Sequence, residues 1–282
     1  MKRLCILFLV LSLSICAGVT LAGNAADFFF VQIADTQLGM TNSNRDMVPE
    51  IENFSKAVDH INSIKPAFVI ISGDLINADH SPKQIRAFWN IAHKINPDIP
   101  LYLVPGNHDI GKANEANINF YRRLFGKDYY SFSHKGNEFL VLNSCLIHDA
   151  DSDVDMRAAQ RKWFESELEA ARKKNPDHIF VCVHHPWFLK SSDEKDEYFN
   201  IPVSERKEYL DLMKRFGVEF ALAGHLHEES IAKDGSLSMI TTSSLGKALG
   251  KTPVGFRVFR VYKDRVEHTY YPLDQVPEQI AK

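Results

Sequence analysis

The sequence is poor in cysteine and has no large excess of charge of either sign. Four cysteines in 282 residues are too few for a disulfide framework. The 33 Lys and Arg residues are nearly balanced by 36 Asp and Glu residues, so the formal charge is −3. Chains that bind the phosphate backbone usually carry a strongly basic footprint, so we expect no nucleic-acid partner. The sequence leaves the oligomeric state open.

Long apolar runs are missing except at the N-terminus. Two basic residues at positions 2–3 precede an apolar stretch from Leu4 to Ile15, and small residues follow it. This order is typical of a secretory signal peptide, and the run is shorter than the ~20 residues that span a membrane. We expect residues 1–22 to be cleaved, which changes the charge from −3 to −5 and gives an exported protein, secreted or periplasmic, without stable membrane association. A lipid-modified Cys16 and an uncleaved anchor are the alternatives.

After this segment, short apolar runs alternate with longer amphipathic stretches. Buried strands are predicted at residues 28–34, 67–72, 101–104, 139–143, 178–183 and 220–223. Helices are predicted at residues 84–95, 155–174 and 204–216, the first beginning at Ser81-Pro82. Alternation of strands and helices predicts an α/β sheet that is covered on both faces.

The last third of the chain has a different pattern. Short strands are predicted at 230–233, 237–242, 256–262 and 265–271, with Lys263-Asp264 as a two-residue hairpin loop. We therefore expect an antiparallel sheet added to the α/β part. No linker or repeat divides the chain, so the prediction is one domain at residues 27–274 with a tail at 275–282.

Two cysteines, Cys145 and Cys182, remain after signal cleavage. Each lies in or at the end of an apolar run, so both are predicted to be buried thiols that act as small hydrophobic residues. Disulfide pairing is the alternative in an oxidising compartment.

Polar residues with metal-ligand chemistry follow five of the predicted strands. Carboxylate, amide and imidazole groups suit divalent cations, and the carboxyl ends of strands in open α/β sheets are where sites form. Each segment alone is a weak signal, but five in order are hard to explain as buried polar groups without a function. The segments are Asp35-Thr36-Gln37, Gly73-Asp74, Gly106-Asn107-His108-Asp109, His184-His185-Pro186 and Gly224-His225-Leu226-His227.

These five segments, in this order, resemble the signature of the calcineurin-like metallophosphoesterases. The resemblance extends over nearly the whole chain after the signal segment. It is strongest to the branch of calcineurin-like phosphoesterase domain-containing proteins described as complete Ser/Thr protein phosphatases. The segments that carry the branch resemblance are 34–37, 106–111, 129–132, 196–200 and 270–274.

The resemblance implies a two-sheet β-sandwich flanked by helices, with two divalent metal ions (Mn, Fe, Mg, Zn or Ca) that activate a water molecule against a phosphate ester. It also implies which residues bind each ion, with Asp74 bridging the two. The first ion would be bound by Asp35, Gln37, Asp74 and His227, and the second by Asp74, Asn107, His184 and His225.

The resemblance also assigns two residues to catalysis. His108 would stabilise charge on the phosphoryl group or protonate the leaving oxygen. Asp109 would orient the imidazole of His108. We expect His184 rather than His185 to bind metal, because the family ligand lies two residues before the proline and neighbouring side chains of a strand point to opposite faces.

Gln37 departs from most of the family, which has histidine at this position. A neutral amide oxygen is a harder and weaker ligand than imidazole, which favours manganese, magnesium or calcium over iron or zinc. It leaves open whether the first metal site is permanently filled.

Two acidic stretches, at residues 148–155 and 192–198, are predicted to be solvated loops or an acidic rim of the site. His185 and Tyr198 are the candidates for substrate contact. The predicted function is hydrolysis of phosphate monoesters, including phosphorylated Ser or Thr of proteins. A phosphodiesterase acting on nucleotide or lipid-derived diesters and a non-catalytic secreted metal-binding module are the alternatives.

Overall fold

The computed structural model describes residues 27–149 and 151–281. The predicted signal peptide at residues 1–22 lies outside the described residues. Within the described residues, no helix is long and apolar enough to cross a membrane.

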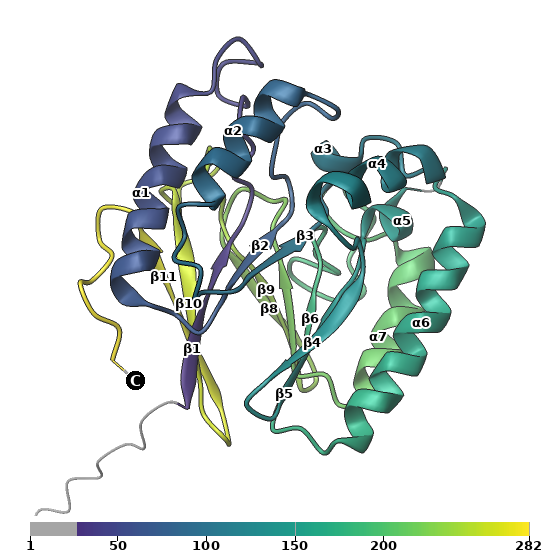
Figure 1. The fold of residues 1–282 in the computed structure, drawn as a ribbon. Helices are drawn as coiled ribbons and strands as arrows, with labels where there is room; N and C mark the ends of the chain where they lie inside the picture. The colour runs from purple at the N-terminus through teal and green to yellow at the C-terminus, as the bar shows by residue number, and fades with distance from the viewer. Residues whose placement is uncertain (1–26, 150, 282) are drawn as a thin grey trace, which may run out of the picture.

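Two β-sheets face each other in the middle of the molecule, and helices cover their outer faces (Figure 1). The first sheet has the order β11-β10-β1-β2-β3 and the second has the order β4-β5-β6-β7-β9-β8. The strands β1, β2 and β3 are parallel to one another, as are β5, β6, β7 and β9. The strands of the first sheet are β1 (Phe28–Ile33), β2 (Val69–Ser72), β3 (Leu101–Val104), β10 (Gly255–Val261) and β11 (Val266–Pro272). Those of the second are β4 (Tyr130–His134), β5 (Asn137–Val141), β6 (Ile179–Cys182), β7 (Phe220–Ala223), β8 (Ser230–Asp234) and β9 (Leu237–Thr241).

Three of the helices, α2, α4 and α6, begin at capping residues. Ser81 accepts a hydrogen bond from the amide of Gln84 at the start of α2, and Asp153 accepts one from Met156 at the start of α6. Figure 1 shows α1 and α2 on the outer face of the first sheet and α6 and α7 on the outer face of the second. The helices are α1 (Val48–Ile64), α2 (Pro82–Ala92), α3 (Asn107–Ile110), α4 (Glu115–Phe125), α5 (Cys145–His148), α6 (Val154–Lys173) and α7 (Val203–Arg215).

Aromatic rings fill the space between the sheets. Phe132, Phe139, Phe180 and Phe220 lie opposite one another on four adjacent strands of the second sheet, with ring centroids 4.8, 4.6 and 5.1 Å apart. Phe30 of the first sheet meets Phe139 and Phe180 edge-on, at 89° and 88°. Each such contact contributes about 0.5–1.5 kcal/mol beyond the buried area, so this layer fixes how the two sheets sit on each other.

The C-terminal strands do not form a separate sheet, contrary to the prediction. The β8–β9 hairpin is the edge of the second sheet, and the β10–β11 hairpin is the edge of the first. Hydrophobic periodicity identifies these strands but does not identify their pairing partners, because pairing is decided by contacts distant in sequence. The segment expected as a tail packs on the domain, since Val276 and Ile280 lie in the hydrophobic cluster under α1 and α2.

The prediction for the two cysteines is confirmed. Among the described residues, Cys145 and Cys182 are both buried and both free. The alternative of a disulfide between them is wrong.

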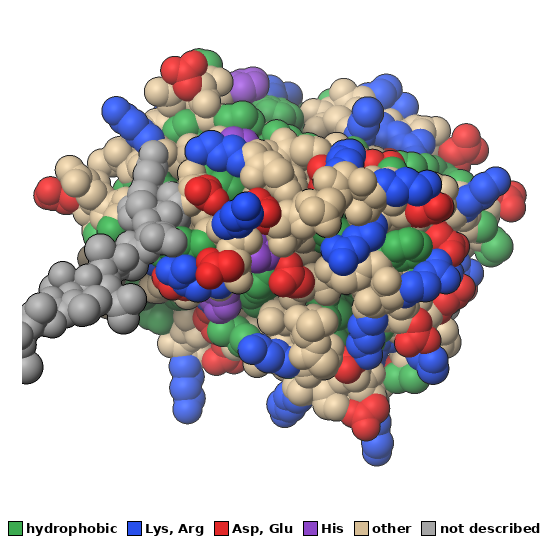
Figure 2. All heavy atoms as spheres, turned by 90° about the horizontal axis from the view of Figure 1, so that it is seen from below, with side chains coloured by type: hydrophobic (Ala, Val, Ile, Leu, Met, Phe, Trp, Pro, Cys, Tyr) green, Lys and Arg blue, Asp and Glu red, His purple; other side chains and the backbone are tan. Residues whose placement is uncertain are grey.

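Charges of both signs are mixed on the surface at the end of the molecule where β1 begins. Figure 2 views this end and shows Lys and Arg interspersed with Asp and Glu. No strongly basic surface lies on this face of the described residues.

Candidate metal centre

The five polar segments meet at one end of the two sheets. They follow β1, β2 and β3 of the first sheet and β6 and β7 of the second. Five of the expected ligands have a left-handed backbone, with φ of 50° at Asp35, 34° at Gln37, 49° at Asp74, 70° at His225 and 57° at His227. Non-glycine residues rarely adopt this conformation, and such strain concentrates at functional sites.

Two glycines allow the ligands to approach the backbone closely. A Cβ at Gly73 would lie 2.5 Å from Nδ1 of His184, and a Cβ at Gly224 would lie 2.6 Å from Oδ2 of Asp35. Any larger residue at either position would displace the side chain that is expected to bind metal.

The first group of ligands contains Asp35, Asp74 and His227, whose ligand atoms lie within 4.8 Å of one another. Nε2 of His227 is 3.3 Å from Oδ1 of Asp35. All three residues are buried. Two buried carboxylates this close together require a compensating positive charge.

The second group is built around His184. Its Nε2 is 3.3 Å from Oδ2 of Asp74, 3.1 Å from Oδ1 of Asn107 and 3.1 Å from Nδ1 of His225. Asp74 therefore lies between the two groups, where a bridging residue is expected. The structure brings together six of the seven residues predicted as ligands, whereas other contacts fix Gln37. His185, which was not predicted as a ligand, has a ring nitrogen within 4.8 Å of ring nitrogens of His184 and His225.

Gln37 provides a direct test of whether the residues fit a cation. Its Nε2 donates to Oδ1 of Asn77 at 3.2 Å. Its Oε1 is buried and, among the described residues, has no hydrogen-bond partner. A buried acceptor without a partner is costly, and an amide oxygen is a suitable ligand for a hard divalent cation. The residues present therefore fit a metal ion.

The histidines show the same fit, because backbone carbonyls bind the nitrogen that faces away from the centre. Nδ1 of His184 lies 2.8 Å from the oxygen of Ser72, Nε2 of His225 lies 3.3 Å from that of Tyr198, and Nδ1 of His227 lies 2.6 Å from that of Lys247. Such partners fix the ring orientation and the tautomer of metal-binding histidines. In each ring the remaining nitrogen faces the centre, and it offers a lone pair to a cation when the ring is neutral.

The pKa values of the imidazoles move in opposite directions. Burial disfavours the charge of His184, but the Asp74 carboxylate outweighs burial and raises the pKa of His184 to about 9. Burial and the neighbouring His184 lower the pKa of His225 to about 3. The surroundings of Asp74 therefore favour a positive charge, whereas those of His225 keep its imidazole neutral, as a metal ligand must be.

The predicted contact between Asp109 and the imidazole of His108 is absent from the described structure, and this part of the prediction is wrong. Oδ1 of Asp109 accepts the amides of Leu75 and Ile76 at 2.8 and 3.2 Å, and Oδ2 accepts the amide of Gly106 at 2.8 Å. These donors occupy both oxygens. Asp109 thus ties the loop after β2 to the loop after β3.

A backbone group orients His108 instead. Nδ1 of His108 lies 2.7 Å from the carbonyl oxygen of Asn77. The carbonyl is an acceptor, so Nδ1 carries a proton and Nε2 is left for a ligand or substrate. The sequence contains no signal for this role of Asn77, since a main-chain carbonyl can belong to any residue.

His184 and His185 do not point to opposite faces of a strand, because β6 ends at Cys182 and both lie in the loop that follows. Their ring centroids are 4.8 and 4.4 Å from that of His225. His185 faces Oγ of Ser144 through Nδ1, at 2.9 Å, and stacks on His148 with ring centroids 4.2 Å apart. Burial, and after it the neighbouring histidines, lower the pKa of His185 well below the usual value.

A small cavity opens beside the second group of ligands. Its volume is about 170 Å³, and its walls include Asn107, His148, His185 and Tyr198. The sequence analysis identified all of these except His148, which lies in a short helix that no periodicity could predict. Tyr198 is 62% exposed, so its ring stands at the mouth of the cavity.

The acidic stretch at 192–198 is held by hydrogen bonds and is not a free loop. The carboxylate of Glu194 accepts the amides of Leu189, Lys190 and Ser191. The buried guanidinium of Arg206 donates to the carbonyls of Ser192 and Glu194, and also to that of residue 201. These contacts fix the loop whose Tyr198 carbonyl faces His225.

Comparison with known proteins agrees with the fold. The family model for calcineurin-like phosphoesterase matches residues 30–229. The chain is 35% identical to the rat (Rattus norvegicus) serine/threonine-protein phosphatase CPPED1, over 89% of this chain and 86% of that protein. A dimetal phosphatase from Danio rerio has the same fold, with a TM-score of 0.65 at 15% identity, over 88% of this chain and 97% of that one. GAP50, the anchor in the inner membrane complex of Plasmodium, has a TM-score of 0.66 at 15% identity, over 90% and 87%.

The fold, the buried carboxylate and imidazole groups and these similarities define a metal-binding hydrolase of phosphoric esters. The chain belongs to the calcineurin-like phosphoesterase family.

Proposed function

We propose that this protein is an exported, metal-dependent phosphatase that hydrolyses phosphate monoesters, with phosphorylated Ser and Thr of proteins as the substrate class. The observation that carries the proposal is the set of three imidazoles that backbone carbonyls hold from behind. The free nitrogen of His227 faces Asp35, that of His184 faces Asp74 and Asn107, and that of His225 faces His184. The 35% identity to a serine/threonine-protein phosphatase supports the substrate class.

Two divalent ions fit the two groups of ligands. Asp35, Gln37, Asp74 and His227 would bind the first, and Asp74, Asn107, His184 and His225 the second. When bound, two such ions supply positive charge for the phosphoryl oxygens and an activated water as nucleophile. Because Gln37 offers a neutral amide oxygen, manganese or magnesium is the metal that we propose for the first site.

His108 is proposed as the general acid. The Asn77 carbonyl holds its Nδ1–H, so a protonated ring directs its second N–H, at Nε2, away from that carbonyl. This proton would pass to the oxygen of the leaving alcohol as the ester bond breaks. General acids of this kind contribute about 10²–10⁴-fold in rate.

The cavity beside Asn107 favours substrates of which only the phosphorylated side chain enters the cavity. Its volume of about 170 Å³ accommodates a phosphoryl group on a short side chain and leaves the rest of the substrate outside. Asp149 on the cavity wall and the acidic residues of the loop at 192–198 would favour basic residues next to the phosphorylated one. His185 and Tyr198 would contact the substrate here.

The export proposal is based on the sequence pattern of residues 1–22. N-terminal sequencing of the protein recovered from cells and medium tests it. A mature chain beginning close to residue 23 supports it, and a chain retaining residues 1–22 in the soluble intracellular fraction contradicts it.

The test of the activity is turnover of the manganese-loaded protein on a panel of phosphopeptides. Phosphoserine and phosphothreonine peptides with basic flanks, matched peptides with acidic flanks, p-nitrophenyl phosphate and bis-p-nitrophenyl phosphate form the panel. We expect monoester hydrolysis, faster with basic flanks, and a loss of about 10²–10⁴-fold in His108→Ala with metal content unchanged. Faster hydrolysis of the diester would show a phosphodiesterase, and equal rates of His108→Ala and wild type would overturn the role of His108.

A further inference from the structure

The open edge of β4 is not protected against pairing. Within the described residues, β4 pairs only with β5. Its sequence, Tyr-Ser-Phe-Ser-His, has no proline, lysine or acidic residue, which are the residues that natural proteins use to protect edge strands. An unprotected edge can accept a further strand.

The register shows which main-chain groups face outward. His134 lies opposite Asn137, on either side of the two-residue turn Lys135-Gly136, in which both φ angles are positive. Such a turn is closed by a hydrogen-bonded pair, and bonded and non-bonded pairs alternate along an antiparallel ladder. Phe132 therefore bonds to β5, whereas Ser131 and Ser133 direct their N–H and C=O groups to the open edge.

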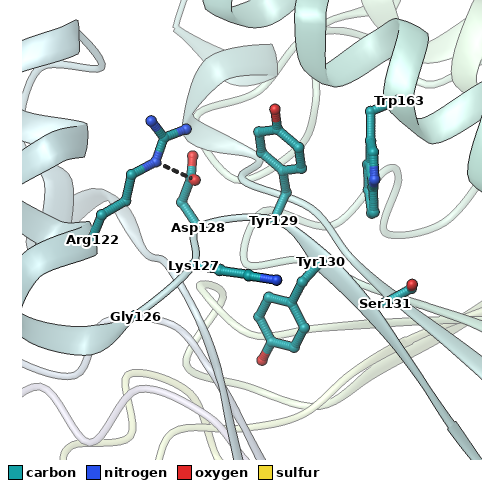
Figure 3. A pocket seen from close by; sticks show the side chains of 8 residues that line it. All are labelled: Arg122, Gly126, Lys127, Asp128, Tyr129, Tyr130, Ser131 and Trp163. Carbon is teal, nitrogen blue, oxygen red and sulfur yellow. Dashed lines mark hydrogen bonds and ion pairs between the residues drawn. The ribbon is translucent and has the colours of Figure 1, made fainter.

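Two pockets lie beside the first half of β4. The larger, about 640 Å³, lies next to α6 and is lined by Tyr129, Ser131 and Trp163, among others. The smaller, about 300 Å³, is lined by residues of β3 and by Trp89 and Phe125. Tyr129 packs on Trp163, and Tyr130 donates to the carbonyl of Leu103 in β3. The two pockets therefore extend to opposite sides of the chain at the start of β4 and adjoin at Lys127 and Tyr130, which line both. Figure 3 shows the larger pocket, with Tyr129 and Tyr130 leaving the chain in opposite directions.

The two pockets differ in chemistry. Lys127 lines both pockets, and apart from it the smaller has apolar and aromatic walls that include Leu101 and Leu103 of β3. In the larger, the carboxylate of Asp128 is already bound by Arg122 and by Asn143. Among the described residues, no carboxylate pairs with Lys127, whose side chain reaches along the pocket. The larger pocket therefore favours a negatively charged side chain.

We infer that the edge of β4 binds an extended peptide segment of a partner protein, in which an acidic side chain and an apolar side chain are neighbours. A strand added to an edge is bound by main-chain hydrogen bonds and sends successive side chains to opposite faces. Here the acidic side chain enters the pocket at Lys127 and Trp163, and the apolar one enters the pocket at Trp89 and Phe125.

A second copy of this chain fits the surface less well. Pairing of β4 with β4 brings Ser131 and Ser133 of both copies to the α6 side. Serine is too small to fill a pocket of 640 Å³. The pockets require larger side chains than the strand itself supplies.

The test is binding of an array of fluorescein-labelled octapeptides to the full-length mature protein, measured by fluorescence anisotropy. In every peptide, positions occupied by Glu, Gln or Lys alternate with positions occupied by Val, Leu or Phe. We expect the Glu peptides to bind with micromolar Kd and the Lys peptides at least 10-fold more weakly. N-methylation of alternate amides in the best peptide should weaken binding at least 10-fold, because it removes main-chain donors without changing the side chains.

Protein variants localise the binding. Ser131→Pro removes an outward N–H, a position at which proline is tolerated in edge strands, and should weaken binding at least 10-fold. Lys127→Glu should weaken binding of the Glu peptide and leave binding of the Gln peptide unchanged. Hydrolysis of p-nitrophenyl phosphate should be unchanged in both variants, which shows that they fold. Absence of binding across the array at 1 mM peptide, or equal Kd for Ser131→Pro and wild type, would overturn the inference, as would dimerisation of the wild type that Ser131→Pro abolishes.

Discussion

Replacing Asp109 by asparagine should destabilise the protein by removing one hydrogen-bond acceptor from a buried site. Both oxygens of Asp109 are occupied, by Leu75 and Ile76 on one side and by Gly106 on the other. Asparagine has one acceptor oxygen, and its NH2 group cannot accept. At least one buried backbone N–H must therefore lose its partner, whichever way the amide is turned.

The magnitude follows from the kind of bond that is lost. A hydrogen bond to a charged group contributes about 1.5–3 kcal/mol, and a buried donor left without a partner costs about 1–3 kcal/mol. These estimates describe overlapping parts of the same loss, so we expect Asp109→Asn to lower the free energy of unfolding by about 2–4 kcal/mol. That is a large fraction of the ~5–15 kcal/mol typical of a domain.

The assay is urea unfolding at neutral pH, with His108→Ala as the matched control. His108→Ala removes a half-buried ring that has one backbone contact, so its free energy of unfolding should change by less than about 1 kcal/mol while its activity falls. Asp109→Asn should show the opposite pattern, with a large loss of stability and less than a 10-fold loss in the rate of hydrolysis. If Asp109→Asn is as stable as the wild type and loses activity like His108→Ala, Asp109 orients the imidazole after all.

Three further predictions concern the metal centre, its loop and the contact between the sheets. Gln37→His should lower the manganese concentration that gives half-maximal activity and shift preference toward zinc, and an unchanged value would mean that residue 37 does not touch the ion. Arg206→Met should raise that same concentration about 10-fold by releasing the loop whose carbonyl faces His225, whereas equal metal affinity would show that the loop does not position this ligand. Burial lowers the pKa of His178, but the Glu219 carboxylate and a backbone carbonyl outweigh burial, and the net pKa is raised above 6.5. The contribution of this pair is therefore fully present below pH 6.5 and is lost as pH rises through the raised pKa, so the fall in Tm over that range should be smaller in Glu219→Gln, and an equal fall would contradict it.

Much of the fold could be predicted from the sequence, because buried parallel strands are continuous apolar runs. The runs at 67–72 and 220–223 correspond to β2 and β7 within two residues. Strand β4 was not predicted, because its alternating serines and aromatic residues also suit a loop. Sheet membership of the C-terminal hairpins could not be predicted, since it depends on pairing of β10 with β1, more than 200 residues earlier in the chain.

The identity of the site could be predicted, whereas its supporting contacts could not. Asp35, Asp74 and His184 carry chemistry in their side chains, and their positions after β1, β2 and β6 place them at one end of the two sheets. The groups that orient them are mostly backbone carbonyls, such as those of Ser72 and Lys247. Any residue has a carbonyl, so only the folded geometry reveals which one is used. Asp109 illustrates the opposite error, since the family resemblance assigned its carboxylate to the imidazole of His108, whereas backbone amides bind that carboxylate.

The metal content of the protein tests the central claim most directly. Wild type and Asp74→Ala would be loaded with manganese, passed through a desalting column and examined by elemental analysis together with p-nitrophenyl phosphate turnover. Because Asp74 lies between both groups of ligands, we predict close to two ions per wild-type chain, and a loss of more than one ion together with all activity in Asp74→Ala. A wild-type protein that hydrolyses the ester and contains no metal after loading would contradict the account.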